Sequence, residues 1–218
     1  MLLLAGCAST QSGPSTGTGS TAPNPAFESA ATTATEPKQR LRIVFDWSLQ
    51  EREAKFSGSG AIRAEPPYHV RLDLFGPRGE GYLSAALVDW DLRLPPGAPT
   101  DVLPPPAMLW SVFGVFRAPQ GAQLVSTKGD AANTELVYRA GDQSWTFTLA
   151  NNRVTKAEWN GPAQGRQTVE IRDYGMRGLP STVVYRDWRA FRELSVTLTQ
   201  VSDVADPFPP NTWTPGVR

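Results

Sequence analysis

The chain has 218 residues, of which 40% are hydrophobic and 19% charged, and its 21 basic and 21 acidic residues give a formal net charge of zero. This length predicts one folded domain with a tail, and the neutral balance argues against a nucleic-acid-binding protein, which usually carries a basic patch. A single cysteine, Cys7, excludes an intrachain disulfide, and a single histidine, His69, argues against a zinc enzyme or a histidine-based triad. We therefore expect no metal site, no cofactor and no enzymatic activity.

The first seven residues end in the stretch Leu4-Ala5-Gly6-Cys7. This stretch resembles the lipobox of bacterial lipoproteins, which implies that Cys7 carries a diacylglycerol and a further acyl chain such as palmitate. A secretory signal has a charged start and an apolar region of about 7–15 residues. Only Met1 to Leu4 precede the small residues here, so we interpret residues 1–7 as a truncated lipoprotein signal or a misplaced start codon. A chance cysteine in a disordered tail is the alternative.

Residues 8–38 are rich in Ser, Thr, Gly and Pro, and Phe27 is their only large apolar residue. Such a segment buries too little apolar surface to offset its ordering entropy, so we predict a disordered tether. Ala8 and Ser9 lack the aspartate that retains lipoproteins at the inner membrane in some bacteria, which favours the periplasmic face of the outer membrane. Residues 39–218 then form the folded domain.

From Leu41 onward the hydrophobic period is two, which predicts β-strands. The first segment, LRIVFDWSL, places Leu41, Ile43, Phe45, Trp47 and Leu49 on one face. About a dozen segments of this kind follow one another with short polar connections, which indicates a meandering antiparallel sheet. A sheet of this size must curl, split or close.

One segment departs from this pattern. Residues 107–116 are apolar except for Ser111, and they follow the prolines Pro104 to Pro106, which suit the first turn of a helix. We therefore predict a buried helix, either as plain core, which is favoured, or as a moving lid. The predicted fold is mainly β, an open (half) antiparallel β-barrel of about eleven strands with this apolar α-helix packed on its concave side.

The order and spacing of several segments resemble the LolA/LolB superfamily of lipoprotein carriers, and its LolB branch in particular. The segments are LFGPRGEGYL, LWSVFG, RVTKAEW, VEIRDY and LSVTLTQV, between about residues 40 and 204. The resemblance implies a concave apolar cavity for acyl chains of lipids or lipoproteins. Its candidate lining residues, each equally compatible with ordinary core, are Phe45, Trp47, Leu72, Leu74, Leu83, Leu87, Leu109, Trp110, Phe113, Trp145, Phe147, Val169 and Ile171.

The turn GPRGEG departs from the LolB pattern. In LolB the residue after the proline is apolar and protrudes to help insert cargo into the membrane, whereas Arg78 follows Pro77 here. An arginine suits a solvated turn or a contact with anionic head groups. Pro77 and Arg78 are therefore the candidate membrane-facing turn, and a role in handling lipids or lipoproteins is favoured over a strict LolB role.

Other polar and aromatic residues receive structural interpretations. The carboxylates of Asp46, Asp73 and Glu170 alternate outward, where a solvated face is expected, and Phe208 and Trp213 are expected to dock and complete the fold. Two functions remain: a monomeric, membrane-anchored lipid or lipoprotein carrier, and a structural envelope lipoprotein that acts through a protein partner. The free volume of the concave face distinguishes them.

Overall fold

The computed structural model describes residues 22–98, 103–162 and 165–216, and its main feature is a single twelve-stranded sheet. The strands are β1 (Leu41–Glu51), β2 (Ala54–Glu65), β3 (His69–Phe75), β4 (Gly81–Val88), β5 (Asp91–Arg93), β6 (Gln123–Gly129), β7 (Asn133–Ala140), β8 (Gln143–Ala150), β9 (Arg153–Gly161), β10 (Gly165–Tyr174), β11 (Pro180–Asp187) and β12 (Arg192–Asp203). The helices of the described residues are α1 (Pro25–Thr35), α2 (Pro106–Val112) and the short 3₁₀ helices η1 (Met176–Gly178) and η2 (Pro210–Trp213).

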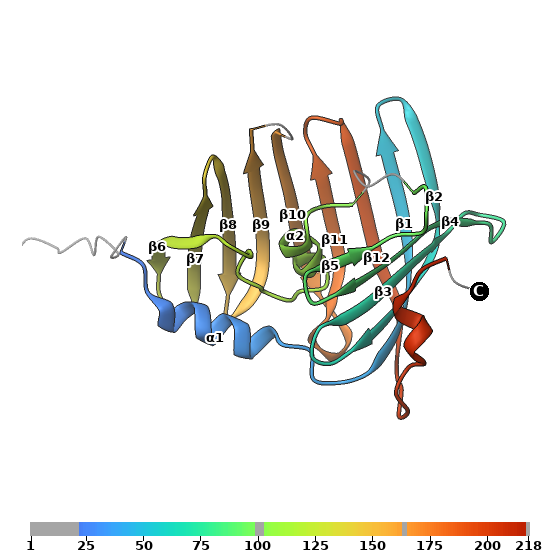
Figure 1. Cartoon of the computed structure of the whole chain (residues 1–218), viewed down its shortest axis with the longest axis horizontal. Coiled ribbons are helices and arrows are strands. Elements are labelled where there is room, and N and C mark those ends of the chain that lie inside the picture. Colours follow the sequence, from blue (N-terminus) through green and yellow to red (C-terminus); the bar gives the residue numbers. More distant parts are fainter. Residues whose placement is uncertain (1–21, 99–102, 163–164, 217–218) are drawn as a thin grey trace, which may run out of the picture.

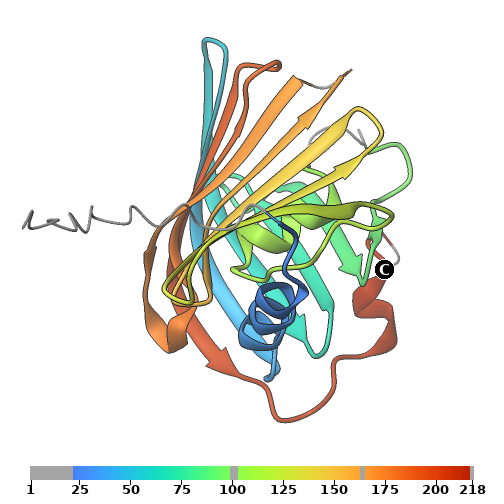
Figure 2. The ribbon, with the colours of Figure 1, turned by 90° about the vertical axis from the view of Figure 1, so that its left-hand side faces the viewer.

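The sheet is antiparallel and open. Its strand order is β5-β4-β3-β2-β1-β12-β11-β10-β9-β8-β7-β6, so two meanders are joined where the first strand pairs with the last. The sheet curls around α2 without closing (Figure 1, Figure 2). The predicted open half-barrel with a helix on its concave side is confirmed, with twelve strands in place of about eleven.

The buried side chains of β1 show why the sheet curls around its own core. Leu41, Ile43, Phe45, Trp47 and Leu49 are all buried, and the side chains between them are mostly exposed, as the period of two predicts. The core forms two clusters, one centred on β1–β4 with Trp110 and one centred on β7–β11 with Phe116. The concave face therefore carries the apolar side chains from both meanders.

Helix α2 is shorter than the sequence predicts. It begins at Pro106 and ends at Val112, although the apolar run continues to Phe116. Gly114 has a φ of 75° and lies against Pro180, and a residue in the left-handed region ends an α-helix. The predicted burial is confirmed, since residues 107–111 are all buried.

Helix α1 corrects the predicted tether. The prediction of disorder over residues 8–38 is wrong for Pro25–Thr35, and residues 8–21 lie outside the described part of the chain. The Asn24 side chain accepts a hydrogen bond from the Ala26 amide at 3.1 Å and caps the helix, and Pro25 occupies its first turn. Helix α1 lies across one end of strands β7–β9 (Figure 1). Neither it nor any other described helix is long and apolar enough to cross a membrane.

The convex face of β3 is covered by the C-terminal segment. Phe208 and Trp213 are buried, as predicted, and the Trp213 ring lies 5.2 Å from that of His69. The prediction that Asp73 lies on a solvated face is also wrong, because this residue is only 7% exposed. Its carboxylate accepts hydrogen bonds from Arg63, Arg71 and Ser84 at 2.6–3.0 Å.

These contacts set the charge state of Asp73. Burial by itself raises the pKa of the Asp73 carboxyl, but the hydrogen bonds from Arg71 and Ser84 and the charges of both arginines outweigh it. The pKa of Asp73 therefore lies below its ordinary value, and the carboxylate stays ionised at neutral pH.

Candidate ligand-binding pocket

Helix α2 occupies the middle of the concave face and is held there by Trp110. The Trp110 side chain is fully buried, and its Nε1 donates a hydrogen bond to the Asp89 carbonyl at 2.8 Å. Its ring makes edge contacts with Tyr68 and Phe113 at centroid distances of 5.7 and 6.2 Å. Helix α2 is therefore packed as part of the hydrophobic core.

The end of α1 is tied to the segment that follows α2. The Thr35 hydroxyl accepts a hydrogen bond from the Phe116 amide at 2.9 Å and donates one to the Ala31 carbonyl at 2.8 Å. This contact joins residues 81 positions apart and fixes where the chain passes from α1 to β1. The end of α1 and the connection to β1 thus line the same space as strands β1 and β12.

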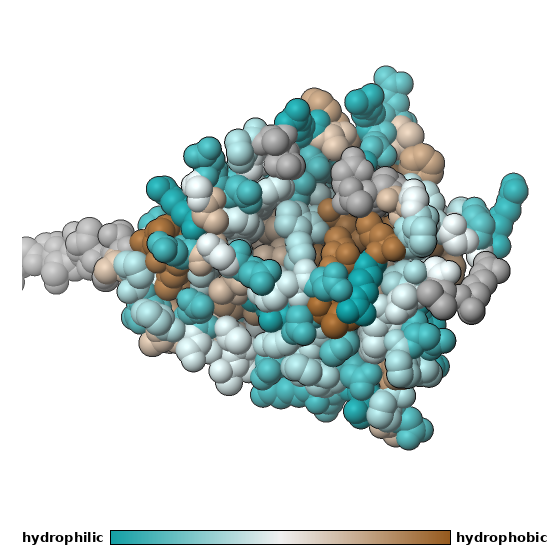
Figure 3. Space-filling model, viewed as in Figure 1, coloured by the Kyte–Doolittle hydropathy of each residue, from teal (hydrophilic) through white to brown (hydrophobic). Residues whose placement is uncertain are grey.

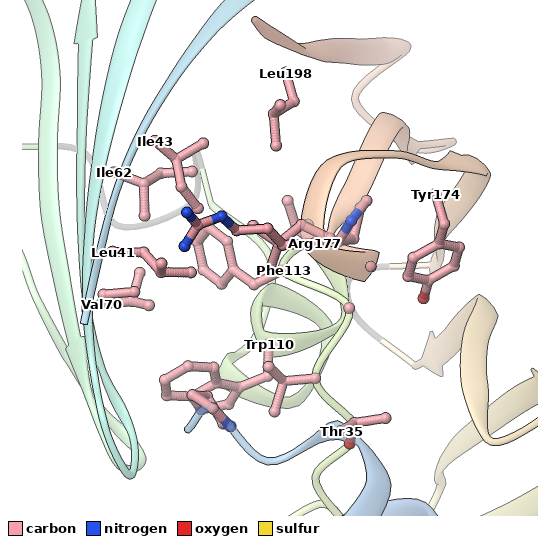
Figure 4. Close-up of a pocket in the computed structure, with 18 of the residues that line it drawn as sticks. Thr35, Leu41, Ile43, Ile62, Val70, Trp110, Phe113, Tyr174, Arg177 and Leu198 are labelled. Carbon is pink, nitrogen blue, oxygen red and sulfur yellow. The ribbon is translucent and has the colours of Figure 1, made fainter. Parts of the chain in front are cut away.

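A cavity of about 440 Å³ remains between α2, the α1–β1 connection, η1 and the sheet. Figure 4 shows Leu41 and Ile43 from β1, Ile62 from β2 and Leu198 from β12 facing Phe113 and Trp110 across this space. Most of the lining is aliphatic or aromatic. The open side of the sheet correspondingly shows apolar side chains bordered by hydrophilic ones (Figure 3).

A smaller cavity of about 40 Å³ adjoins the first one. The two share Phe45, Ile62, Phe113 and Val196 among their lining residues. The small cavity is also lined by Leu72, Leu74 and Leu109, and the Phe113 side chain lines both spaces.

Charged side chains also line the larger cavity. Among the described residues these are Lys38 from the α1–β1 connection, Arg153 and Arg177, and Glu36 is the one lining carboxylate. Arg177 extends from η1 toward Ile43 in Figure 4 and forms an ion pair with Asp203 at the end of β12. Hydrogen bonding to Arg177 lowers the pKa of the Asp203 carboxyl.

The neighbourhood of Arg153 is set by Tyr174. The Arg153 guanidinium lies 5.2 Å from the centre of the Tyr174 ring, and the Tyr174 hydroxyl donates to the Val154 carbonyl at 2.6 Å. Burial raises the pKa of Tyr174 to about 12, although the charge of Arg153 acts in the opposite direction. Tyr174 is thus a neutral part of the cavity wall.

The structure brings together some of the thirteen predicted cavity residues. Phe45, Trp110 and Phe113 line the larger cavity, and Leu72, Leu74 and Leu109 line the smaller one. The other seven are packed in the two core clusters and line neither cavity: Trp47, Leu83, Leu87, Trp145, Phe147, Val169 and Ile171.

Several lining residues were missed, although the sequence carried a signal for them. Leu41 and Ile43 share the face of Phe45, and Leu198 pairs directly with Phe45 across β1 and β12. The alternation of each strand identified the face, but the pairing of the first strand with the last decides which part of that face lines the cavity.

The other two predicted sites lie elsewhere. Pro77 and Arg78 occupy an exposed turn between β3 and β4, in which the Arg78 amide donates to the Glu80 carboxylate at 2.9 Å. Cys7 lies outside the described residues. The roles of these residues stay predictions.

Solved structures share this architecture. A LolA superfamily protein from Nitrosomonas europaea matches 88% of this chain and 97% of its own at a TM-score of 0.55 and 14% identity. A putative outer membrane lipoprotein-sorting protein domain from Vibrio parahaemolyticus matches 86% of this chain and 94% of its own, with a TM-score of 0.56 and 5% sequence identity. The chain has the LolA-like fold.

A DUF1329 family protein from Desulfovibrio piger has the same LolA-like fold over 88% of this chain and 98% of its own, with a TM-score of 0.51 and 8% identity. No protein-family model and no curated protein matches the sequence. At these identities the similarity shows the fold alone.

Proposed function

We propose that the cavity binds an acyl chain of a lipid or a lipoprotein, and that the protein is a carrier or chaperone in lipid or lipoprotein handling at the bacterial outer membrane. The observation that carries this proposal is the apolar space of about 440 Å³ that α2 leaves unfilled. Small-molecule sites usually measure about 300–1,000 Å³ and are mostly apolar. Each buried methylene contributes roughly 0.8 kcal/mol, so a chain needs few polar contacts.

The position of Trp110 and Phe113 favours a carrier over a purely structural lipoprotein. If these rings filled the concave face, no ligand would fit beside them. Both rings instead form one wall of the cavity, and Trp110 is held in that wall by its bond to Asp89. The LolA-like fold, with its similar lipoprotein-sorting domain, supports the same proposal.

Lipid that co-purifies with the chain tests the proposal. The purified protein is extracted with organic solvent, and the extract is analysed by mass spectrometry beside a parallel preparation of an unrelated protein. We expect an acyl lipid enriched with this chain, and uptake of a fluorescent fatty acid after delipidation. Absence of both refutes the carrier, and a stoichiometric protein partner recovered without lipid establishes the structural alternative.

We further propose that Cys7 anchors the domain to the membrane through its lipids. Two or more acyl chains anchor stably, whereas one anchors only marginally. Cells fed a fatty-acid probe should label the protein, and Cys7→Ala should remove the label and release the protein from membranes. Label that survives in Cys7→Ala contradicts this anchor but leaves the cavity proposal untouched.

A further inference from the structure

The cavity is large enough to hold an acyl chain. A molecule in liquid water occupies about 30 Å³, and a methylene group is of similar size. The cavity of about 440 Å³ therefore has room for at least about 15 such groups, which is enough for an acyl chain.

The charges around the cavity are unbalanced. Among the described residues, neither Lys38 nor Arg153 forms an ion pair with a carboxylate. The carboxylates nearby are already engaged, since Glu36 interacts with the Tyr68 hydroxyl and Asp203 pairs with Arg177. The η1 side of the cavity thus has unmatched positive charge.

Both arginines lie at η1. The Arg153 guanidinium is beside Gly178, since a Cβ there would meet its Nη2 at 3.4 Å. Arg177 belongs to the same 3₁₀ turn and reaches over the cavity toward Ile43 (Figure 4). Guanidinium groups bind carboxylates and phosphates through charge-assisted hydrogen bonds.

We infer that the ligand is an amphiphile with an anionic head, a carboxylate or a phosphate, whose acyl chain enters the cavity and whose head lies at η1, near Arg153 and Arg177. This inference rests on the proposed function and adds the ligand class. The head competes with Asp203 for Arg177, and Lys38 adds to the positive field on the α1 side.

Displacement of a neutral fluorescent probe tests this ligand class. Delipidated full-length protein is loaded with N-phenyl-1-naphthylamine and titrated with dodecanoate, dodecyl phosphate and dodecyltrimethylammonium, which have the same chain length and differ in head group. We expect each anion to displace the probe at concentrations about tenfold lower than the cation. The order of the two anions distinguishes a fatty acid from a phosphate-headed lipid.

Arginine variants locate the effect. Arg153→Gln with Arg177→Gln should abolish the preference for anions, because the unpaired Asp203 then faces the head group. Arg42→Gln is the matched control, since Arg42 is exposed on the opposite face of β1 and should keep the preference. Unchanged discrimination in the double variant overturns the inference.

Each remaining outcome separates the two proposals. Failure of the neutral probe to bind refutes the acyl-binding cavity itself. Binding of the probe with equal displacement by anion and cation refutes only the anionic head.

Discussion

Filling the cavity from one strand should abolish ligand binding without unfolding the sheet. Leu198 lies on β12 opposite Phe45 and points toward the middle of the cavity (Figure 4). Its side chain is only half-buried, so a larger side chain extends into open space and not into packed neighbours. We therefore choose Leu198→Trp.

The size of the effect follows from the volume that the indole takes. Tryptophan has about six more side-chain heavy atoms than leucine, and each methylene displaced from the cavity costs roughly 0.8 kcal/mol of binding. The loss is about 5 kcal/mol, which weakens binding roughly 3,000-fold. Aromatic residues suit β-strands, so the melting temperature should stay near that of the parent protein.

Thr197→Trp is the matched control. Thr197 is the adjacent residue on β12 and is exposed on the opposite face of the sheet. Titration with N-phenyl-1-naphthylamine should show parental affinity for Thr197→Trp and loss of binding for Leu198→Trp. A Leu198→Trp protein that melts like the parent and binds the probe equally well would show that the ligand lies elsewhere.

Two further substitutions test the supports of the fold. Asp73→Asn should lower the free energy of unfolding by about 1–3 kcal/mol at pH 7, because Arg63 and Arg71 lose the carboxylate that they pair with. The folded pKa of Asp73 lies below its unfolded value of about 3.9, so its contribution is complete above that pH and is lost as the pH falls through the folded pKa. Urea titrations of the parent protein and of Asp73→Asn should show that the difference in their free energies of unfolding becomes smaller in acid. A difference that does not change with pH contradicts this reasoning. Trp110→Phe should lower the free energy of unfolding by about 1–3 kcal/mol, because the Asp89 carbonyl loses its hydrogen-bond donor. The probe should still bind to this variant, in an enlarged cavity. Loss of probe binding by a stable Trp110→Phe protein would show that the indole itself contacts the ligand.

The strands could be predicted from the sequence because one physical rule governs them all. A sheet with one buried face needs an apolar residue at every second position, and β1 obeys this from Leu41 to Leu49. The buried helix followed from an uninterrupted apolar run, but its end required the backbone at Gly114, which composition does not show.

Helix α1 was missed because its burial is small and its capping signals are local. Ala31 is its one buried residue, and Phe27 packs only partly against the core. Composition therefore predicted disorder, although Asn24 followed by Pro25 is a start signal for a helix. Asp73 was misplaced for a different reason, since a period of two shows which face a residue takes but not that a distant C-terminal segment covers it.

The sequence predicted an apolar cavity but only part of its lining, because the lining residues come from both meanders. Leu41 and Ile43 come from the first strand of the sheet, and Val196 and Leu198 come from the last. Their pairing joins residues about 155 positions apart, as in the bond from Thr199 to the Val44 carbonyl. The ligand space therefore exists only once the two ends of the domain have met. A ligand that binds this folded state alone stabilises the β1–β12 pairing by mass action, by about 2.7 kcal/mol at a hundred times its Kd. Occupancy of the cavity and the pairing of β1 with β12 are thus coupled equilibria.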